Sequence, residues 1–246
     1  MKQNHKICVL IPARYSSTRF EGKPLAEIHG KPLIYYAYEA AIHTPGINAV
    51  YVATEDDRIR RSVEMFGGKT ILTSNQHLTG TDRIVEAIQK IDSDIIVNVQ
   101  GDEPLVTSSM IQELYAPLLM NQNLKVTNLI SKIDTIADFV DANVVKCVLN
   151  QKKEIMCFTR SAIPYPKSRQ AFIAYKQIGM YAFRREALVQ FGKMEQTLLE
   201  KIEGVEMLRF LENGISIQAV ETESKTISVD TLSDLMEARK ALQFHV

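Results

Sequence analysis

The first hundred residues alternate short β-rich runs with longer helical runs, and this alternation constrains the fold more than any other feature. Strands are predicted at 7–12, 49–53, 69–73 and 94–99, and helices between them at 32–41, 56–65 and 81–91. A run that is apolar throughout, such as 7–12, is typical of a strand buried on both faces. The βαβα order predicts a mostly parallel sheet covered by helices, which binds ligands at the carboxyl ends of its strands.

The second half of the chain has a less regular pattern. Strands are predicted at 126–131, 144–149, 156–160, 179–183 and 215–220, and helices at 185–191, 198–212 and 232–242. No internal repeat and no linker interrupts the 246 residues. We therefore predict a single α/β domain over 1–246, Rossmann-like, with a mostly parallel mixed sheet and a smaller antiparallel insertion.

Charge and composition exclude several classes of protein. The 29 Lys and Arg residues balance 29 Asp and Glu residues, whereas dedicated nucleic-acid binders carry a basic excess. Apolar stretches fall short of the ~20 residues that a membrane helix needs, and three cysteines are too few for a disulfide framework. The N-terminus enters a strand-like run instead of a signal peptide. We expect a cytoplasmic protein with no nucleic-acid or membrane partner.

A polar loop at 13–23 follows the first predicted strand. It carries three cations (Arg14, Arg19 and Lys23) and three hydroxyl residues at 16–18. Backbone N–H groups, hydroxyls and cations at the end of a parallel strand suit an anionic triphosphate. The spacing of a Walker A motif is absent. The alternative interpretation is an ordinary polar surface loop.

The segment Asn-Val-Gln-Gly-Asp-Glu-Pro at 98–104 follows the buried strand at 94–99. A carboxylate just past a central strand is well placed to hold Mg²⁺ together with nucleotide phosphates, and Asp102 is that carboxylate. Asp102 can instead be a turn or cap residue, or form a general acid–base pair with Glu103. We favour the magnesium ligand.

Two further segments precede predicted helices. Thr79 to Arg83 opens the helix at 81–91, where Thr81 or Asp82 can cap the helix while the first amides bind base or phosphate oxygens. Asp230 precedes the last helix and can either cap it or act as a second metal ligand. Spacing alone does not decide between these two roles. The five histidines show no metal-ligand spacing, and no Gly-x-Ser-x-Gly elbow of a serine hydrolase occurs.

Together and in order, these segments resemble the 3-deoxy-manno-octulosonate (Kdo) cytidylyltransferase family over nearly the whole chain. Each segment alone is weak evidence, but the ordered set is specific. The matching segments are 11–15, 22–25, 80–83, 97–104, 143–148, 158–161, 178–184, 206–209 and 229–231.

The resemblance implies a glycosyltransferase-A-like nucleotidyltransferase fold and a homodimer. The nucleotide-binding part would span roughly 1–110, and the sugar-binding and dimerisation part roughly 111–230. The implied reaction joins CTP and a 3-deoxy-ulosonic acid to give a CMP-sugar and pyrophosphate, for lipopolysaccharide or capsule assembly. Catalysis of such a transfer is mostly positioning and electrostatic stabilisation.

The resemblance also assigns roles to residues. Arg14 and Lys23 would neutralise the phosphates, and Asp102 and Asp230 would hold Mg²⁺; Arg14, Lys23 and Asp102 are the expected catalytic residues. The expected nucleotide-binding residues are Pro12, Ala13, Arg14, Lys23, Thr79, Gly80, Asp82 and Arg83. The expected sugar-binding residues are Gln100, Arg160, Gln177, Tyr181 and Glu206.

Two positions depart from the family pattern in its sugar-binding part. Gln177 stands where the family usually has His, and Met207 stands where it usually has Gln. A neutral amide cannot donate from a cation, and Met does not hydrogen-bond as Gln does. These departures leave open a modified octulosonate, such as an amino-substituted one, or a nonulosonate as the acceptor.

A hypothesis from another class is a non-catalytic nucleotide-binding regulator on the same fold. That hypothesis predicts the loss of charged site residues. Arg14, Lys23, Asp102 and Asp230 are all present, which favours the enzyme.

Overall fold

The computed structural model describes residues 5–16, 20–167 and 173–243. Two compact units divide the chain: unit 1 comprises 1–112 and 225–246, and unit 2 comprises 113–224. The expectation of one domain with two functional parts stays a prediction. The hydroxyl and cationic side chains of Ser17, Thr18 and Arg19 in the polar loop lie outside the described residues.

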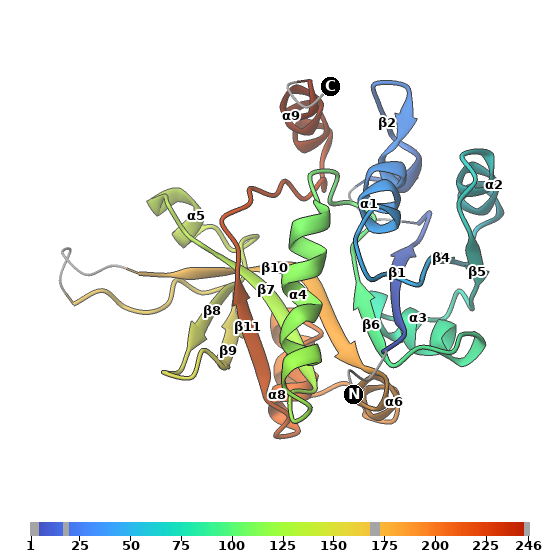
Figure 1. Cartoon of the computed structure of the whole chain (residues 1–246). Helices are drawn as coiled ribbons and strands as arrows, with labels where there is room; N and C mark the ends of the chain where they lie inside the picture. Colours follow the sequence, from blue (N-terminus) through green and yellow to red (C-terminus); the bar gives the residue numbers. More distant parts are fainter. Residues whose placement is uncertain (1–4, 17–19, 168–172, 244–246) are drawn as a thin grey trace. The chain divides into compact units, whose positions relative to one another are not determined.

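Unit 1 is built on a parallel sheet with the strand order β6–β1–β4–β5 (Figure 1). All seven residues of β1 are buried, as expected of a central strand that is apolar throughout. The predicted strands of the first hundred residues are thereby confirmed. Their bounds are β1 (Ile7–Ala13), β4 (Ala49–Thr54), β5 (Thr70–Leu72) and β6 (Ile95–Asn98).

Helices connect these strands, and capping residues mark where they begin. Asp56, Thr79 and Thr231 each accept a backbone N–H bond at the first turn of a helix. The helices of unit 1 are α1 (Leu33–Ile42), α2 (Asp57–Met65), α3 (Gly80–Ala87) and α9 (Leu232–Leu242), with short 3-10 turns η1 (Lys23–Leu25) and η2 (Ile88–Lys90). A two-stranded hairpin joins β2 (Glu27–Ile28) to β3 (Lys31–Pro32).

The C-terminal segment returns to unit 1 and packs there. Val229, Leu235 and Ala238 form one buried cluster with Ile28 and Leu33. Burying these apolar side chains stabilises the docked position of α9. The segment just before α9, which contains Asp230, is therefore held against unit 1.

Unit 2 has a mixed sheet in which β7 lies between a parallel and an antiparallel neighbour. β7 (Val126–Lys132) pairs in parallel with β11 (Ile217–Glu221) and antiparallel with β10 (Tyr175–Arg184). β8 (Lys146–Leu149) pairs antiparallel with both β10 and β9 (Ile155–Thr159). The α/β class with a smaller antiparallel portion is confirmed.

The helices of unit 2 include two that the sequence pattern did not predict. These are α4 (Ser108–Met120), within which the division between the units falls, and the short α5 (Ile136–Val140). The predicted helix at 185–191 is confirmed as α6 (Arg185–Phe191).

The predicted continuous helix at 198–212 is wrong. Gly204 adopts a left-handed φ of 63°, and the chain forms α7 (Leu198–Glu203) and α8 (Leu208–Glu212) instead. Left-handed backbone terminates a helix, and glycine adopts it without steric strain. Arg209 of α8 is 2% exposed and pairs with the buried Glu200 of α7.

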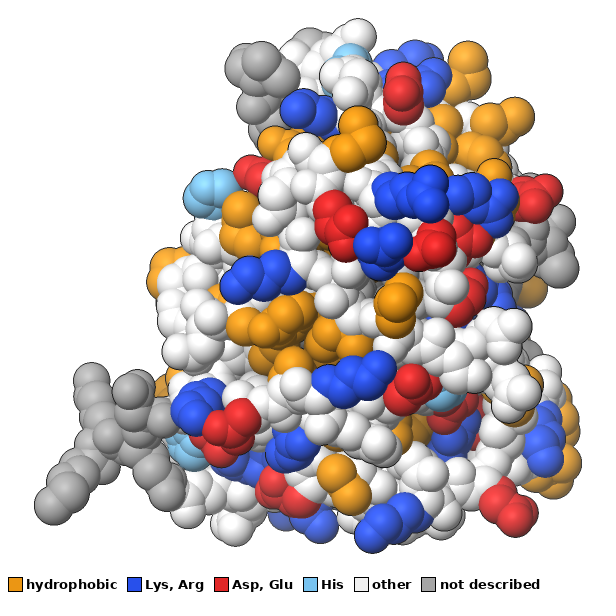
Figure 2. All heavy atoms as spheres, turned by 90° about the vertical axis from the view of Figure 1, so that its right-hand side faces the viewer, with side chains coloured by type: hydrophobic (Ala, Val, Ile, Leu, Met, Phe, Trp, Pro, Cys, Tyr) orange, Lys and Arg blue, Asp and Glu red, His pale blue; other side chains and the backbone are white. Residues whose placement is uncertain are grey.

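Charges on the face shown in Figure 2 are mixed, with Lys and Arg side chains lying among Asp and Glu side chains. This distribution accords with the equal numbers of the two signs in the sequence. Across the described ranges 5–16, 20–167 and 173–243, no helix has both the length and the apolar composition needed to cross a bilayer.

Candidate active site

A cavity of about 280 Å³ in unit 1 opens at the carboxyl ends of β1 and β6. This is the edge at which a parallel sheet presents its ligand site. Ten of the residues expected from the sequence line the cavity: Pro12, Ala13, Arg14, Lys23, Thr79, Gly80, Arg83, Gln100, Asp102 and Asp230. Pro24, His77, Leu78 and Gly101 complete the lining.

A shared cation joins the two predicted metal ligands. Lys23 Nζ donates to Asp102 Oδ2 at 2.6 Å and to Asp230 Oδ1 at 3.0 Å. Burial opposes the charge on Lys23, but the two carboxylates outweigh burial and raise the pKa of Lys23 above its ordinary value. Lys23 is therefore protonated, and carries a positive charge, at neutral pH.

Backbone contacts hold these three side chains in place. The loop reaches Lys23 through Gly22, whose φ of 69° is left-handed and whose N–H donates to Tyr15 O at 2.9 Å. On the other side, Val229 N donates to Asp102 O at 2.9 Å. This bond sets Asp230 beside Asp102, although the two are far apart in sequence.

The donor set around Lys23 fits a magnesium ion. Asp102 and Asp230 already direct oxygen atoms at one cationic atom, and carboxylate oxygens are the ligands that Mg²⁺ prefers. Mg²⁺ is usually held by one or two carboxylates together with substrate phosphates. Among the described residues, no three His, Cys, Asp or Glu side chains gather into a metal-binding cluster. Any metal here would take its remaining ligands from nucleotide and water.

The N-terminus of α3 forms a second wall of the cavity. Thr79 Oγ1 accepts from Asp82 N at 3.1 Å, so the expected capping role belongs to Thr79 rather than to Thr81 or Asp82. Asp82 lies outside the lining of the cavity and accepts from the Thr79 hydroxyl at 2.8 Å. A Cβ atom at Gly80 would lie 3.3 Å from Pro12 Cγ, so glycine permits the close approach of α3 to β1.

The two cavity arginines differ in their surroundings. Arg83 is 4% exposed and pairs with Glu55 at 2.6 Å, and Thr73 Oγ1 also accepts from it at 2.6 Å. Burial lowers the pKa of Arg83, and the nearby charge of Arg14 lowers it further against the opposing effect of Glu55. Arg14 is exposed at the cavity. Arg14 is thus better placed than Arg83 to meet an incoming phosphate.

Glu103 is buried outside the lining of the cavity. Burial, followed by the charge of Asp102, raises the pKa of Glu103 to about 8 despite a hydrogen bond from Ser228. Its Oε2 atom has no hydrogen-bond partner among the described residues. This placement gives no support to an acid–base pair of Asp102 and Glu103, because the second carboxyl does not face the cavity.

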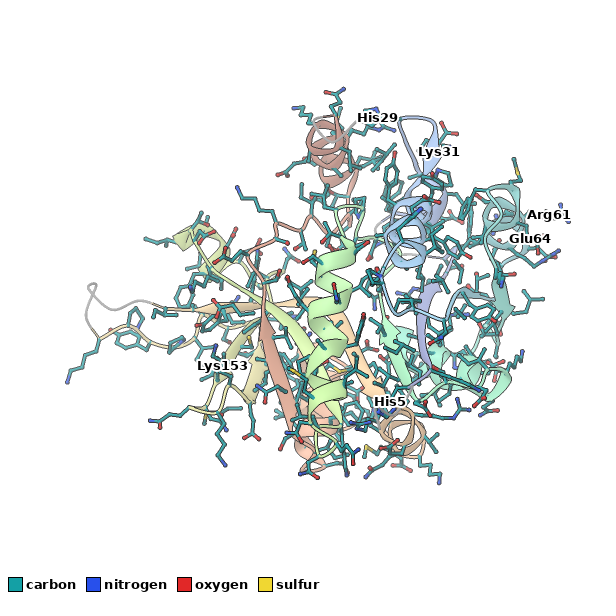
Figure 3. All side chains as sticks on the ribbon, viewed as in Figure 1. His5, His29, Lys31, Arg61, Glu64 and Lys153 are labelled. Carbon is teal, nitrogen blue, oxygen red and sulfur yellow. The ribbon has the colours of Figure 1, made fainter. Side chains whose placement is uncertain are left out.

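His77 lines the cavity and was not expected there from the sequence. Its Nε2 atom lies 2.5 Å from Glu86 Oε2, and Ser74 N donates to the same oxygen at 2.8 Å. His77 belongs to no metal-ligand spacing in the sequence, and its position two residues before the cap Thr79 is the signal that places it near the cavity. By contrast, His5 beside the start of β1 and His29 in the β2–β3 turn lie at opposite ends of unit 1 (Figure 3).

The other expected sugar residues lie in unit 2. Gln177 and Tyr181 are on β10, where they pair with Ile130 and Asn128 across an irregularity in the register. The Gln177 Nε2 atom is buried and has no partner among the described residues. Gln177 therefore carries a donor that a ligand oxygen could accept from.

Arg160 is held by the end of α7. Its backbone N–H donates to Glu203 Oε2 at 2.8 Å and its Nε to Glu203 O at 2.6 Å. Its Nη1 atom also donates to Ala142 O at 2.9 Å. Glu206 is half-buried between Gly204 and α8, and Met207 has no exposed surface. Of the two departures, only Gln177 thus presents an unsatisfied polar group.

Comparisons with known proteins identify relatives of this chain. A family model described as cytidylyltransferase matches residues 8–220. The 3-deoxy-manno-octulosonate cytidylyltransferase of Geotalea daltonii is 44% identical over an aligned length of 249 residues. The alignment covers 97% of this chain and 98% of that protein. The Escherichia coli protein of the same name is 38% identical over 234 residues, 95% of each chain.

A solved structure gives the same relationship in three dimensions. It is described as CMP:2-keto-3-deoxy-manno-octonic acid synthetase complexed with CTP. It matches with a TM-score of 0.93 and 37% identity, covering 98% of this chain and 100% of that chain. With a family model over most of its length and relatives above 30% identity, the chain belongs to the 3-deoxy-manno-octulosonate cytidylyltransferases, a family of nucleotidyltransferase enzymes.

Proposed function

We propose that this enzyme transfers the CMP group of CTP to Kdo and releases pyrophosphate. The observation that carries the proposal is the cluster of Lys23, Asp102 and Asp230 in the cavity at the carboxyl ends of β1 and β6. Such a cluster supplies both a cation for phosphate oxygens and carboxylates for a divalent ion. The names of the relatives and the CTP bound in the related structure support the choice of substrates.

The chain's own residues would bind and orient the nucleotide. Arg14 is an exposed cation at the cavity and would meet the phosphates. Thr79 and Gly80, at the start of α3, line the cavity. The first amides of this helix would bind oxygens of the base or phosphates, because a helix N-terminus favours negative charge. Lys23 would turn from the carboxylates to the phosphates as these arrive, because it is already charged and in place.

In the proposed reaction the anomeric 2-hydroxyl of the sugar attacks the α-phosphorus, and the bond to the pyrophosphate oxygen breaks. Negative charge gathers on the phosphate oxygens during this displacement. Once the nucleotide is bound, Arg14 and Lys23 would stabilise that charge from positions taken up before the reaction, which lowers the barrier.

Asp102 and Asp230 would hold Mg²⁺ in this proposal. When bound, the ion would polarise the α-phosphate and lower the pKa of the attacking hydroxyl. The support is the convergence of both carboxylates on one cationic atom in unit 1.

The sugar-binding residues proposed in unit 2 are Arg160, Gln177, Tyr181 and Glu206. Gln100, also expected to bind the sugar acid, lines the cavity of unit 1. The unsatisfied Nε2 donor of Gln177 favours a second candidate in the same reaction class. A neutral amide in place of a cationic donor suits an acceptor altered at the group it contacts, such as an amino-substituted octulosonate or a nonulosonate.

The product would serve lipopolysaccharide or capsule assembly, and the enzyme would act as a cytoplasmic homodimer. These proposals follow from the resemblance to the family, to which the matched family model and the curated relatives assign the chain. Size-exclusion chromatography with light scattering tests the dimer, since a particle of twice 27.8 kDa is expected.

Pyrophosphate release with CTP, Mg²⁺ and a panel of acid sugars tests the function. Release with Kdo is expected, and omission of Mg²⁺ should abolish it. The panel includes an amino-substituted octulosonate and a nonulosonate, each at equal concentration. Release with one of these and not with Kdo would replace Kdo by that acid. If a protein that binds CTP released no pyrophosphate with any of these acids, the proposed transferase activity would be overturned.

A further inference from the structure

The register of β10 changes abruptly between two residues expected to bind the sugar. Gln177 pairs with Ile130 and Tyr181 pairs with Asn128, so four steps along β10 match two steps along β7. Residues four apart in a regular strand are ~13 Å apart, whereas residues two apart are ~7 Å apart. The bulge thus brings Gln177 and Tyr181 to about half the separation that a regular strand would give them.

A bulge withdraws backbone groups from the ladder, and these groups need other partners. Asn128 provides them. Its Nδ2 atom donates to Ile178 O at 2.9 Å and to Met180 O at 2.9 Å, both inside the bulge. Asn128 has no exposed surface and lies on β7, which pairs with β10 and with β11.

The orientation of the Asn128 amide is set by the bulge. Its Oδ1 atom is buried and has no hydrogen-bond partner among the described residues. The reverse orientation would place this oxygen against two carbonyl oxygens, which repel it. One polar atom is therefore left unsatisfied so that both N–H groups can hold the bulge.

We infer that Asn128 is a positioning residue of the acceptor site, because its carboxamide holds the β10 bulge that sets Gln177 beside Tyr181. The inference rests on the proposed function in taking these two residues as ligands of the sugar acid. Asn128 itself acts through the bulge. Its loss should weaken the acceptor's binding and leave the nucleotide cavity of unit 1 intact.

Steady-state kinetics of Asn128→Leu provides the main test. Leucine keeps the number and branching of the side-chain heavy atoms and removes both donors. The KM for Kdo is expected to rise at least tenfold, because small displacements of positioning groups have large effects. The KM for CTP should stay within about twofold. An unchanged KM for Kdo, or equal increases for both substrates, would overturn the inference.

Thr127→Val is the matched control, since Thr127 is equally buried on the same strand. The Thr127 hydroxyl donates to Leu114 O at 2.7 Å, so the variant also loses a buried hydrogen bond but not the contacts to Ile178 and Met180. Its KM for Kdo should remain near that of the unsubstituted enzyme. A rise equal to that of Asn128→Leu would mean that general loosening of β7 is the cause.

Amide hydrogen exchange separates this inference from the proposed function. Exchange at residues 178–180 should be at least tenfold faster in Asn128→Leu and unchanged in Thr127→Val. If the unsubstituted enzyme releases no pyrophosphate with Kdo, the proposed function fails. Unchanged exchange in Asn128→Leu would separately refute the role of Asn128 in holding the bulge. If Asn128→Leu does not fold, Asn128→Ser, whose hydroxyl can donate a single hydrogen bond, enters the same assays with the same expectations.

Discussion

Lys23 Nζ donates to Asp102 Oδ2 at 2.6 Å, across 79 residues of sequence. A second carboxylate, that of Asp230, accepts from the same nitrogen at 3.0 Å. An ammonium therefore occupies the point on which two acidic side chains converge, inside a cavity lined by further polar groups. The same atoms can serve a divalent ion and a polyphosphate in turn, which ties the geometry to the proposed reaction.

Asp102→Asn should reduce turnover at least about 10²-fold while the fold persists, because an amide is a poor ligand for a hard cation. Pyrophosphate release measures the turnover, and thermal unfolding checks the fold. Asp94→Asn is the control, since Asp94 is an exposed carboxylate just before the opposite end of β6. Near-normal turnover in a folded Asp102→Asn protein would remove Asp102 from the mechanism.

Lys23→Met should make the protein more responsive to magnesium in the absence of nucleotide. Removing the ammonium leaves two carboxylates facing each other, and we expect the free energy of unfolding to fall by about 2 kcal/mol. Adding Mg²⁺ should restore part of the loss and raise Tm more than it does in the unsubstituted protein. Thermal unfolding over a magnesium titration measures this difference. Equal responses in both proteins would argue against a metal site at these carboxylates.

Glu200→Leu or Arg209→Met should destabilise the protein by about 3–5 kcal/mol, because each leaves a buried charge without its oppositely charged partner. Arg209 donates twice to Glu200, at 2.8 and 2.6 Å, and both residues are at most 3% exposed. The double variant Glu200→Leu with Arg209→Met should lose much less free energy of unfolding than either single variant. Urea unfolding at pH 7 measures all three. Additive losses in the double variant would show that the charges do not act as a pair.

Glu203→Gln should alter how stability depends on pH. The Arg160 N–H, and with it the Thr159 hydroxyl, lowers the pKa of Glu203 despite partial burial. A carboxyl group with a lowered pKa in the folded state stabilises the protein at pH values above its ordinary pKa of 4.5. This contribution is lost as the pH falls through the folded-state pKa. The unsubstituted protein should thus exceed Glu203→Gln by about 1 kcal/mol at pH 7, and the difference should shrink below pH 4.5.

Urea unfolding between pH 7 and pH 3.5 measures that difference. Glu195→Gln is the control, because Glu195 is an exposed carboxylate of the same unit. A stability difference for Glu203→Gln that stays constant over the whole range would mean that the charge of Glu203 makes no contribution.

Local patterns were sufficient for most of the secondary structure. The apolar runs that became β1 and β6 are recognisable because a strand buried on both faces needs no polar alternation. α4 was missed although its buried residues, such as Met110, Leu114 and Leu118, recur at helical spacing. Pro117 within that helix is a signal against helix, and tertiary packing overrode it.

Sequence by itself determined which chemical groups stand at the ends of the buried strands, and hence the cavity residues from Pro12 to Asp102. Only the tertiary structure decided which of those groups pair with one another. Lys23 meets Asp230 across 207 residues, and Arg83 is turned to Glu55 inside the protein. Caps and periodicity depend on neighbours within a few residues, so a sequence displays them. Pairings between distant segments, such as the register of the β10 bulge, depend on how whole elements pack, and no local pattern records that.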